Sequence, residues 1–141
     1  MKKLVWVVDD DPNMRAAMRM MFTLIGYEMR EFKDARSAAQ ALLAGETPEI
    51  LFLDINMPEV TGLELLQFIR QRTQWRHLPV LMVSSESDDV RVEQAIRIGA
   101  DGYVFKPVNI EELQMAIKVA VDRRKAVTGE LKFPSTQIYW F

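Results

Sequence analysis

The segment LFLDINMPEVTGLELL, residues Leu51–Leu66, places an acidic residue directly after a run of apolar residues. The run from Ile50 to Leu53 has the length and the apolar character of a buried strand. Asp54 follows at once, then a proline, and the apolar spacing predicts a helix over 62–72 that begins with a glycine. A carboxylate at the end of so apolar a strand needs a chemical explanation.

Strand-like and helix-like segments alternate along the chain. Strands are predicted over 4–8, 27–32, 49–54, 79–84 and 103–105, and helices over 12–25, 35–44, 62–72, 88–98 and about 110–124. Continuously apolar strands are typical of a parallel sheet that helices cover on both faces. The predicted fold class is therefore α/β, with a doubly wound five-stranded parallel sheet in (βα)5 order.

Composition excludes several classes of function. The 141 residues suit one domain, and the formal net charge of −2 gives no bias toward nucleic acid or an anionic membrane. The chain has no cysteine and one histidine, which excludes thiol catalysis and argues against a histidine-based metal site. No apolar stretch suits a signal peptide or a membrane span. We expect a cytoplasmic protein that contacts neither membrane nor nucleic acid directly, with His77, Arg70, Arg72 and Arg76 exposed to solvent.

Polar side chains follow four of the five predicted strands. They are Asp9, Asp10 and Asp11 after the first strand, Asp54 after the third, Ser84 after the fourth and Lys106 after the fifth. The carboxyl ends of parallel strands meet at one edge of the sheet, where ligands bind in such folds. Clustered carboxylates repel one another unless a cation joins them, and oxygen-only ligands favour Mg²⁺ over zinc.

This set of groups suits phosphoryl transfer, in which catalysis consists mainly of positioning and of neutralising charge on the phosphoryl oxygens. A carboxylate can itself be the nucleophile and form an aspartyl phosphate. The pattern therefore predicts that Asp54 is held at the strand end to meet a phosphoryl donor. Asp11, which precedes Pro12, is expected only to cap the following helix.

Four segments, VVDDDPNMR, LFLDINMPEVTGLELL, VLMVSSE and GYVFKP, occur in this order. They resemble the signature segments of receiver domains of two-component response regulators, most closely the CheY-like chemotaxis type. Asp54 follows Asp10 by 44 positions and precedes Ser84 by 30 and Lys106 by 52, as in that family. The resemblance covers about residues 3–125. It implies a flavodoxin- or CheY-like fold, with a receiver domain over 1–127 and a tail over 128–141.

The resemblance implies a phosphorelay function and a role for each matching residue. Asp54 would accept a phosphoryl group from a phosphohistidine of a sensor histidine kinase or a histidine phosphotransfer protein. Mg²⁺ would be held by Asp10 and Asp54, by Asp9 through water, and by the backbone carbonyl of Asn56. Ser84 and Lys106 would contact phosphoryl oxygens.

Other family features concern the output of the domain. Pro107 matches a cis-proline, and Tyr103 matches an aromatic residue that switches together with Ser84. A downstream effector protein would bind the surface formed by residues 88–98, 103–105 and 110–124. The chain would then be a signalling switch rather than an enzyme, limited to self-phosphorylation and autodephosphorylation. Phe105 departs from the common pattern, because it is bulky and shares a face with Tyr103.

Three alternatives remain open at this point. A haloacid-dehalogenase-type phosphatase also uses a strand-end Asp, Mg²⁺, a hydroxyl and a Lys, but it wants a second acid where this chain has Asn56. A receiver-like module could signal without phosphate. A flavodoxin-like flavin carrier shares the fold, but no phosphate-cradling loop follows the first strand.

The tail breaks the strand–helix pattern. Gly129 and Pro134 argue against a longer helix, and Ile138–Phe141 is apolar and strand-prone. This tail could dock on its own domain, pair with another molecule, or begin a linker to an output domain. A phosphorylation- or tail-dependent homodimer is a further expectation.

Overall fold

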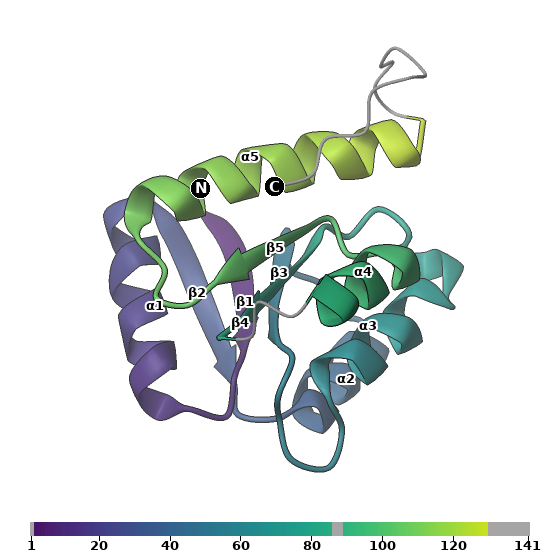
Figure 1. The fold of residues 1–141 in the computed structure, drawn as a ribbon, viewed down its shortest axis with the longest axis horizontal. Helices are drawn as coiled ribbons and strands as arrows, with labels where there is room; N and C mark the ends of the chain where they lie inside the picture. Colours follow the sequence, from purple (N-terminus) through teal and green to yellow (C-terminus); the bar gives the residue numbers. More distant parts are fainter. Residues whose placement is uncertain (1, 86–88, 130–141) are drawn as a thin grey trace.

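The computed structural model describes residues 2–85 and 89–129. Within this part a single parallel sheet has the strand order β2-β1-β3-β4-β5, with helices on both sides (Figure 1). The strands are β1 (Lys3–Val8), β2 (Tyr27–Phe32), β3 (Ile50–Asp54), β4 (Val80–Ser84) and β5 (Gly102–Phe105). The helices are α1 (Pro12–Leu24), α2 (Ala35–Leu43), α3 (Gly62–Arg70), α4 (Asp89–Ile98) and α5 (Ile110–Val127), with a short 3₁₀ helix η1 (Thr73–Trp75). The predicted fold class is confirmed.

Side chains of the loops cap several helices. The Asp11 side chain accepts a hydrogen bond from the Asn13 N–H at 2.9 Å, so the predicted cap of α1 is confirmed. Asn109 accepts one from the Glu112 N–H at 2.8 Å and caps α5 in the same way. These caps satisfy N–H groups that the first helical turn leaves without partners.

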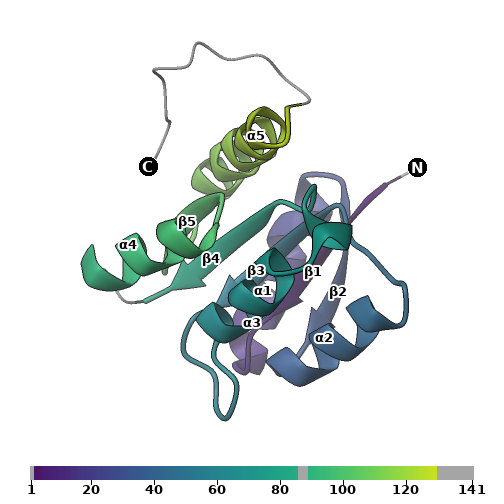
Figure 2. The ribbon, with the colours of Figure 1, turned by 90° about the vertical axis from the view of Figure 1, so that its right-hand side faces the viewer.

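Two apolar cores lie on opposite faces of the sheet, because successive residues of a strand point to opposite sides. One face carries α2, α3 and α4, and its core includes Trp6, Leu53 and Leu66. The other carries α1 and α5, and its core includes Phe22 and Phe52. The two views of the ribbon show these helix layers on either side of the strands (Figure 2).

The central strand β3 carries Asp54 to the edge of the sheet. All five residues of β3 are buried, and the strand pairs with β1 on one side and β4 on the other. Leu53 is in register with Val8, so Asp9 and Asp54 each follow a paired position on neighbouring strands. The sheet therefore brings residues from distant parts of the chain to one edge.

The expectation for Arg70 is wrong, because its guanidinium is not on a solvent-exposed face. It donates to the backbone carbonyls of Gly99 and Leu78 and to the carboxylate of Asp101, each at 2.8 Å. Asp101 is fully buried and also accepts from Arg123 and Arg124, an ion cluster that the sequence pattern did not indicate. Arg76 and His77 are exposed as expected, and Arg72 is partly exposed against the ring of Phe68.

Other differences lie at the ends of elements. Helix α5 continues to Val127, three residues beyond the expected end, and Gly129 follows with φ +83°. The interpretations of the tail concern residues that lie outside the described part of the chain from residue 130 onward. Among the helices that the structure describes, none combines the length and the apolar character that crossing a membrane requires.

Candidate functional site

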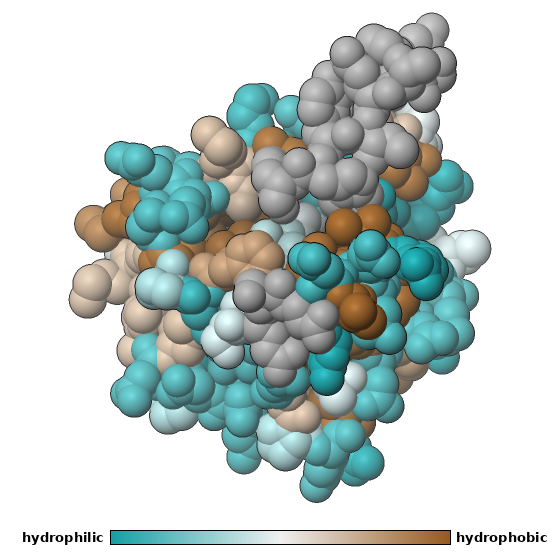
Figure 3. Space-filling view, in the orientation of Figure 1, coloured by the Kyte–Doolittle hydropathy of each residue, from teal (hydrophilic) through white to brown (hydrophobic). Residues whose placement is uncertain are grey.

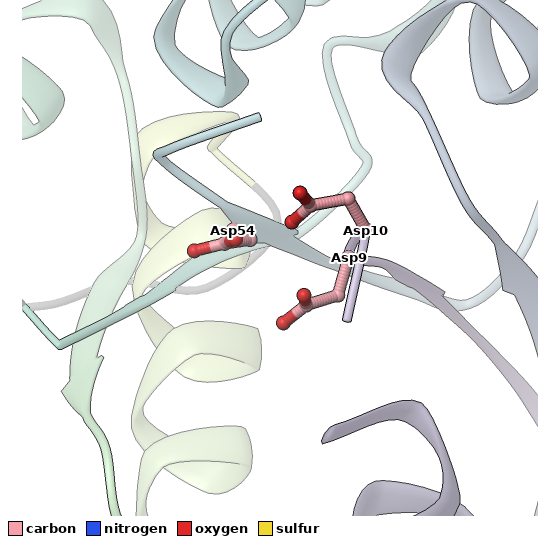
Figure 4. A group of neighbouring side chains, drawn as sticks. All are labelled: Asp9, Asp10 and Asp54. Carbon is pink, nitrogen blue, oxygen red and sulfur yellow. The ribbon is translucent and has the colours of Figure 1, made fainter. Parts of the chain in front are cut away.

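Three carboxylates converge at the carboxyl edge of the sheet. Asp9 and Asp10 follow β1 and Asp54 ends β3, and one oxygen of each lies within 4.8 Å of an oxygen of the others. Figure 4 shows the three side chains next to one another, with the carboxylates of Asp9 and Asp10 on the side that faces Asp54. The structure thus brings together the acids that the sequence placed at separate strand ends.

The three acids differ in their contact with solvent. Asp9 and Asp54 are buried, with 2 % and 6 % of their surface exposed, whereas Asp10 is exposed. The Asp11 N–H donates to Asp9 Oδ1 at 2.9 Å and holds that carboxylate in place. Asp10 therefore stands at the mouth of a site whose floor is formed by Asp9 and Asp54.

Lys106 supplies a cation to this floor. Its Nζ lies 3.0 Å from Asp9 Oδ2 and 3.5 Å from Asp54 Oδ1. Burial opposes its charged form, but the hydrogen bond to Asp9 and the charge of Asp54 outweigh that effect and raise the pKa of Lys106. The lysine is therefore a fixed positive charge, and the peptide bond that joins it to Pro107 is cis, as the resemblance implied.

The pKa of Asp54 lies close to neutral pH. Burial and, next, the charge of Asp9 raise its pKa to about 6, with a smaller contribution from Asp10 and with Lys106 opposing them. A carboxylate with such a pKa is ionised at pH 7 but only weakly stabilised by its surroundings. Its negative charge is therefore available for a reaction or for a cation.

Ser84 and Asn56 lie near this floor by their positions on the strands. Asp54 is in register with Val83, so the fully buried Ser84 is the next residue at the same edge. Its backbone carbonyl accepts a hydrogen bond from the Lys106 N–H at 2.9 Å, which links it to the strand-end lysine. Asn56 is exposed in the loop two residues beyond Asp54. The roles that the resemblance gives to these two residues remain predictions.

Gly62 is a positioning residue that the sequence reasoning treated only as the start of a helix. Its N–H donates to the Ile55 carbonyl at 3.0 Å, and a Cβ atom at this position would overlap the backbone carbonyl of Asp54. The loop from β3 to α3 can close against Asp54 only because this residue lacks a side chain. The signal was present in the quoted segment, where a glycine begins a helix otherwise made of good helix formers.

Tyr103 lies on the edge strand β5, which β4 separates from the strands that carry the acids. Its side chain is buried, with 4 % exposed, and its ring packs on that of Phe105 with centroids 5.0 Å apart. The prediction that Phe105 shares a face with Tyr103 is confirmed, and Phe105 remains 40 % exposed. The switching role of Tyr103 stays a prediction.

The donor set fits a hard divalent cation. The cluster consists of carboxylate oxygens alone, with neither histidine nor cysteine among its members. Mg²⁺ prefers one or two carboxylates and keeps several waters, so an arrangement with one solvent-exposed acid and two buried ones suits it.

Comparison with known proteins identifies the family. Residues 5–118 match the response regulator receiver domain. The chain belongs to this family. Receiver domains are signalling switches of two-component systems, so the phosphatase and flavin-carrier alternatives are not supported.

Curated relatives include both transcriptional regulators and a chemotaxis protein. The chain is 33 % identical over 131 residues to the transcriptional regulatory protein KdpE of Mycobacterium tuberculosis, covering 93 % of this chain and 56 % of that protein. It is 29 % identical over 116 residues to the chemotaxis protein CheY1 of Helicobacter pylori, covering 82 % of this chain and 94 % of CheY1. The chain thus spans about half the length of KdpE and most of the length of CheY1.

The fold is also that of solved receiver structures. The chemotaxis protein CheY4 of Vibrio cholerae superposes with a TM-score of 0.75 at 28 % identity, covering 84 % of this chain and 98 % of CheY4. The five-stranded CheY-like architecture expected from the sequence is therefore found in the fold and in its relatives.

Proposed function

We propose that the protein is a phosphorylation-controlled receiver in which Asp54 accepts a phosphoryl group. The observation that carries this proposal is the position of Asp54. A nearly buried carboxylate with a pKa of about 6 ends the central strand, between two further acids and a lysine whose Nζ is 3.5 Å away. Such a group is held rigidly, is ionised at neutral pH and has a cation beside it.

In the proposed reaction a lone pair of one Asp54 carboxylate oxygen forms a bond to phosphorus. The bond between phosphorus and the histidine nitrogen of the donor breaks, and its electron pair stays on that nitrogen, which takes up a proton so that neutral imidazole leaves. Lys106 stays protonated because its pKa is raised, and its ammonium group neutralises charge on a phosphoryl oxygen. The Ser84 hydroxyl, at the adjacent strand end, is the proposed donor to another phosphoryl oxygen.

The acid cluster is the proposed Mg²⁺ site, where Asp10, Asp54 and the Asn56 carbonyl would hold the ion and Asp9 would do so through water. Bound there, Mg²⁺ supplies Lewis-acid neutralisation of phosphoryl and carboxylate charge. The chain's own residues do the remaining work. The Asp11 N–H holds the Asp9 carboxylate before a ligand arrives, and Asp10 is exposed to solvent at the open side of the site. Hydrolysis of the aspartyl phosphate, with water as the nucleophile at phosphorus, would return the site to rest.

The proposed partners follow from this chemistry. The donor is a phosphohistidine-bearing protein, a sensor histidine kinase or a histidine phosphotransfer protein. The receiver of the signal is an effector protein at the surface of α4, β5 and α5, where Tyr103 and Phe105 lie. A phosphorylation-dependent homodimer and a cytoplasmic location belong to the same proposal.

Incubation with acetyl phosphate and Mg²⁺, followed by intact mass measurement, tests the acceptor. We expect one phosphoryl adduct in the native chain and none in Asp54→Asn. Asp11→Asn is the matched control, because this neighbouring acid only caps α1 and Asn is an equally good cap. An adduct that persists in Asp54→Asn would refute the assignment.

A thermal melt tests the metal separately. A ligand that binds only the folded state raises its stability, so Mg²⁺ at millimolar concentration should raise the Tm of the native chain. Asp10→Asn should abolish this rise without impairing folding, because Asp10 is exposed. NaCl at matched ionic strength is the control for general screening. An equal rise in the Tm of Asp10→Asn on adding Mg²⁺ would show that the acid cluster is not the Mg²⁺ site.

A further inference from the structure

An apolar groove lies between β5 and α5. It encloses about 200 Å³ and is lined by Tyr103, Val104, Phe105, Glu112, Met115 and Ala116, of which only Glu112 is charged. Its rim carries two exposed apolar side chains, because Met115 is 65 % exposed and Phe105 is 40 % exposed. Figure 3 shows hydrophobic atoms among hydrophilic ones on the face that includes β5 and α5. Exposed apolar patches of this kind mark binding sites.

A partly apolar track leads from this groove to the end of α5. Met115, Val119 and Ala126 are separated by four and seven residues, so they share one side of the helix, where the charged Asp122 lies between Val119 and Ala126. Val119 and Ala126 are both partly exposed. A segment that returned along α5 from its last turn would pass Asp122 and then follow Val119 and Met115 to the groove.

The chain can make that return. The Gly129 N–H donates to the Ala126 carbonyl, and its φ of +83° ends the helix in a conformation that turns the backbone away from the helix axis. Ala126 lies about 17 Å from Met115 along the helix, at a rise of about 1.5 Å per residue. The eight residues 130–137 span about 26 Å when extended, at about 3.3 Å per residue. Residues 138–141 can therefore reach the groove.

Residues 138–141 have the apolar side chains that an apolar groove binds. Residues 138–141 are Ile, Tyr, Trp and Phe, an apolar and aromatic cluster without charge. Aromatic side chains contribute much of the apolar contact in such pockets. A larger hollow of about 390 Å³ at the other end of the sheet is lined by the charged Lys3, Glu49, Arg124 and Lys125 and suits this cluster less well.

We propose that the 138–141 segment docks in cis into the groove between β5 and α5 and covers Met115 and Phe105. The proposal stands on the groove, the track and the reach, and it does not require phosphorylation of Asp54. One consequence rests on the proposed function: a docked segment would occupy the surface offered to an effector, so effector binding would have to displace it.

Tryptophan fluorescence tests the docking in the full, unphosphorylated chain. Trp6 and Trp75 are buried, at 0 % and 4 % exposed, so quenching by acrylamide reports mainly on Trp140. Trp140→Phe supplies the background to subtract. We expect Met115→Ser to raise the quenching constant of Trp140 by about threefold or more, because most molecules would change from a docked to an undocked 138–141 segment.

Met20→Ser is the matched control, because Met20 is 68 % exposed on α1 and lies outside the groove. It should leave the quenching constant unchanged, while Phe105→Ser should act as Met115→Ser does. Equal quenching of Trp140 in the native chain and in Met115→Ser would overturn the proposal. Protection that disappears on dilution, with a dimer mass by light scattering, would also overturn it in favour of docking into a second copy.

Discussion

Lys106 and Asp9 stand 97 positions apart in the chain, yet they form an ion pair of 3.0 Å at the floor of the acid cluster. The same ammonium lies 3.5 Å from Asp54. One lysine therefore offsets the repulsion between two buried carboxylates, and it lowers the pKa of Asp54 against the effect of burial.

Replacement of this lysine should impair phosphoryl acceptance without removing the acceptor. In Lys106→Met we expect the rate of adduct formation from acetyl phosphate to fall about 100-fold, as when one preorganised charge-stabilising donor is lost. The pKa of Asp54 should rise further, because Lys106 lowers it in the native chain. Stopped-flow kinetics and NMR titration of Asp54 measure the two effects. Lys118→Met, at an exposed lysine on α5, is the control, and an equal loss of rate there would contradict a specific role for Lys106.

The raised pKa of Asp54 predicts a pH dependence of stability. Its pKa rises from 3.8 to about 6 on folding, so between these values the folded state binds more protons than the unfolded state. Ionisation of Asp54 should therefore lower the free energy of unfolding as pH increases from about 4 to about 6, by on the order of 2–3 kcal/mol. Below pH 4 this group contributes no further change.

Urea denaturation of the native chain and of Asp54→Asn across this range measures that contribution in the absence of Mg²⁺. Asp54→Asn should be the more stable protein at pH 7, and the two chains should converge as pH falls toward 4. Asp11→Asn, which changes an exposed cap, should track the native chain. Parallel curves for native and Asp54→Asn would show that burial does not hold the pKa of Asp54 up.

Much of the site could be predicted because it depends on strand ends. In a parallel sheet the carboxyl ends share one edge, so the sequence positions of Asp9, Asp54, Ser84 and Lys106 were enough to place them together. Local signals such as the Asp11 cap and the apolar run of β3 fixed the elements that carry them. The resemblance of four segments to receiver domains then suggested the chemical role of each residue, which its position alone does not define.

The parts that were missed depend on contacts between distant elements. Arg70 looks like any surface arginine at the end of α3, and only the packed fold shows it enclosed by Gly99, Leu78 and Asp101. Position 62 likewise requires a glycine because the loop closes against the backbone carbonyl of Asp54. The spacing of apolar residues in the sequence does not show this contact. Such requirements follow from tertiary packing, which overrides local propensity.

Gly62→Ala should therefore damage both the fold and the acceptor loop. The added methyl group would overlap the Asp54 carbonyl, which is backbone and cannot move without shifting the acceptor itself. We expect a loss of about 2–4 kcal/mol in the free energy of unfolding, in the range of overpacked and strained sites. Slower adduct formation should accompany it under conditions where the variant is still folded.

Gly45→Ala is the comparison for backbone strain alone. Gly45 has φ +94° with no atom near its missing Cβ, so the change should cost only about 1 kcal/mol and leave the adduct rate unaltered. Urea denaturation and adduct kinetics on both variants separate the two effects. Equal losses of stability, with equal rates, would mean that the contact between Gly62 and Asp54 does not position the acceptor.

The buried ion cluster at the other end of the sheet gives the sharpest prediction for stability. Asp101 is fully buried and accepts from Arg70, Arg123 and Arg124, each at 2.8 Å, as well as from the Val80 N–H at 2.9 Å. Asp101→Asn would leave three guanidinium groups without their carboxylate and would present an amide where only acceptors fit. We expect a loss of about 3–5 kcal/mol, as for other buried pairs from which one partner is removed.

Glu31→Gln is the matched control, since Glu31 also pairs with two arginines, Arg15 and Arg19, but is 40 % exposed. Water screens that pair, so its removal should change the free energy of unfolding by less than about 1 kcal/mol. Urea denaturation at pH 7 measures both variants. A larger loss in Asp101→Asn would show that Asp101 joins α3, β4 and α5 at the amino end of the sheet. A loss no larger than in Glu31→Gln would mean that the three arginines do not need this carboxylate.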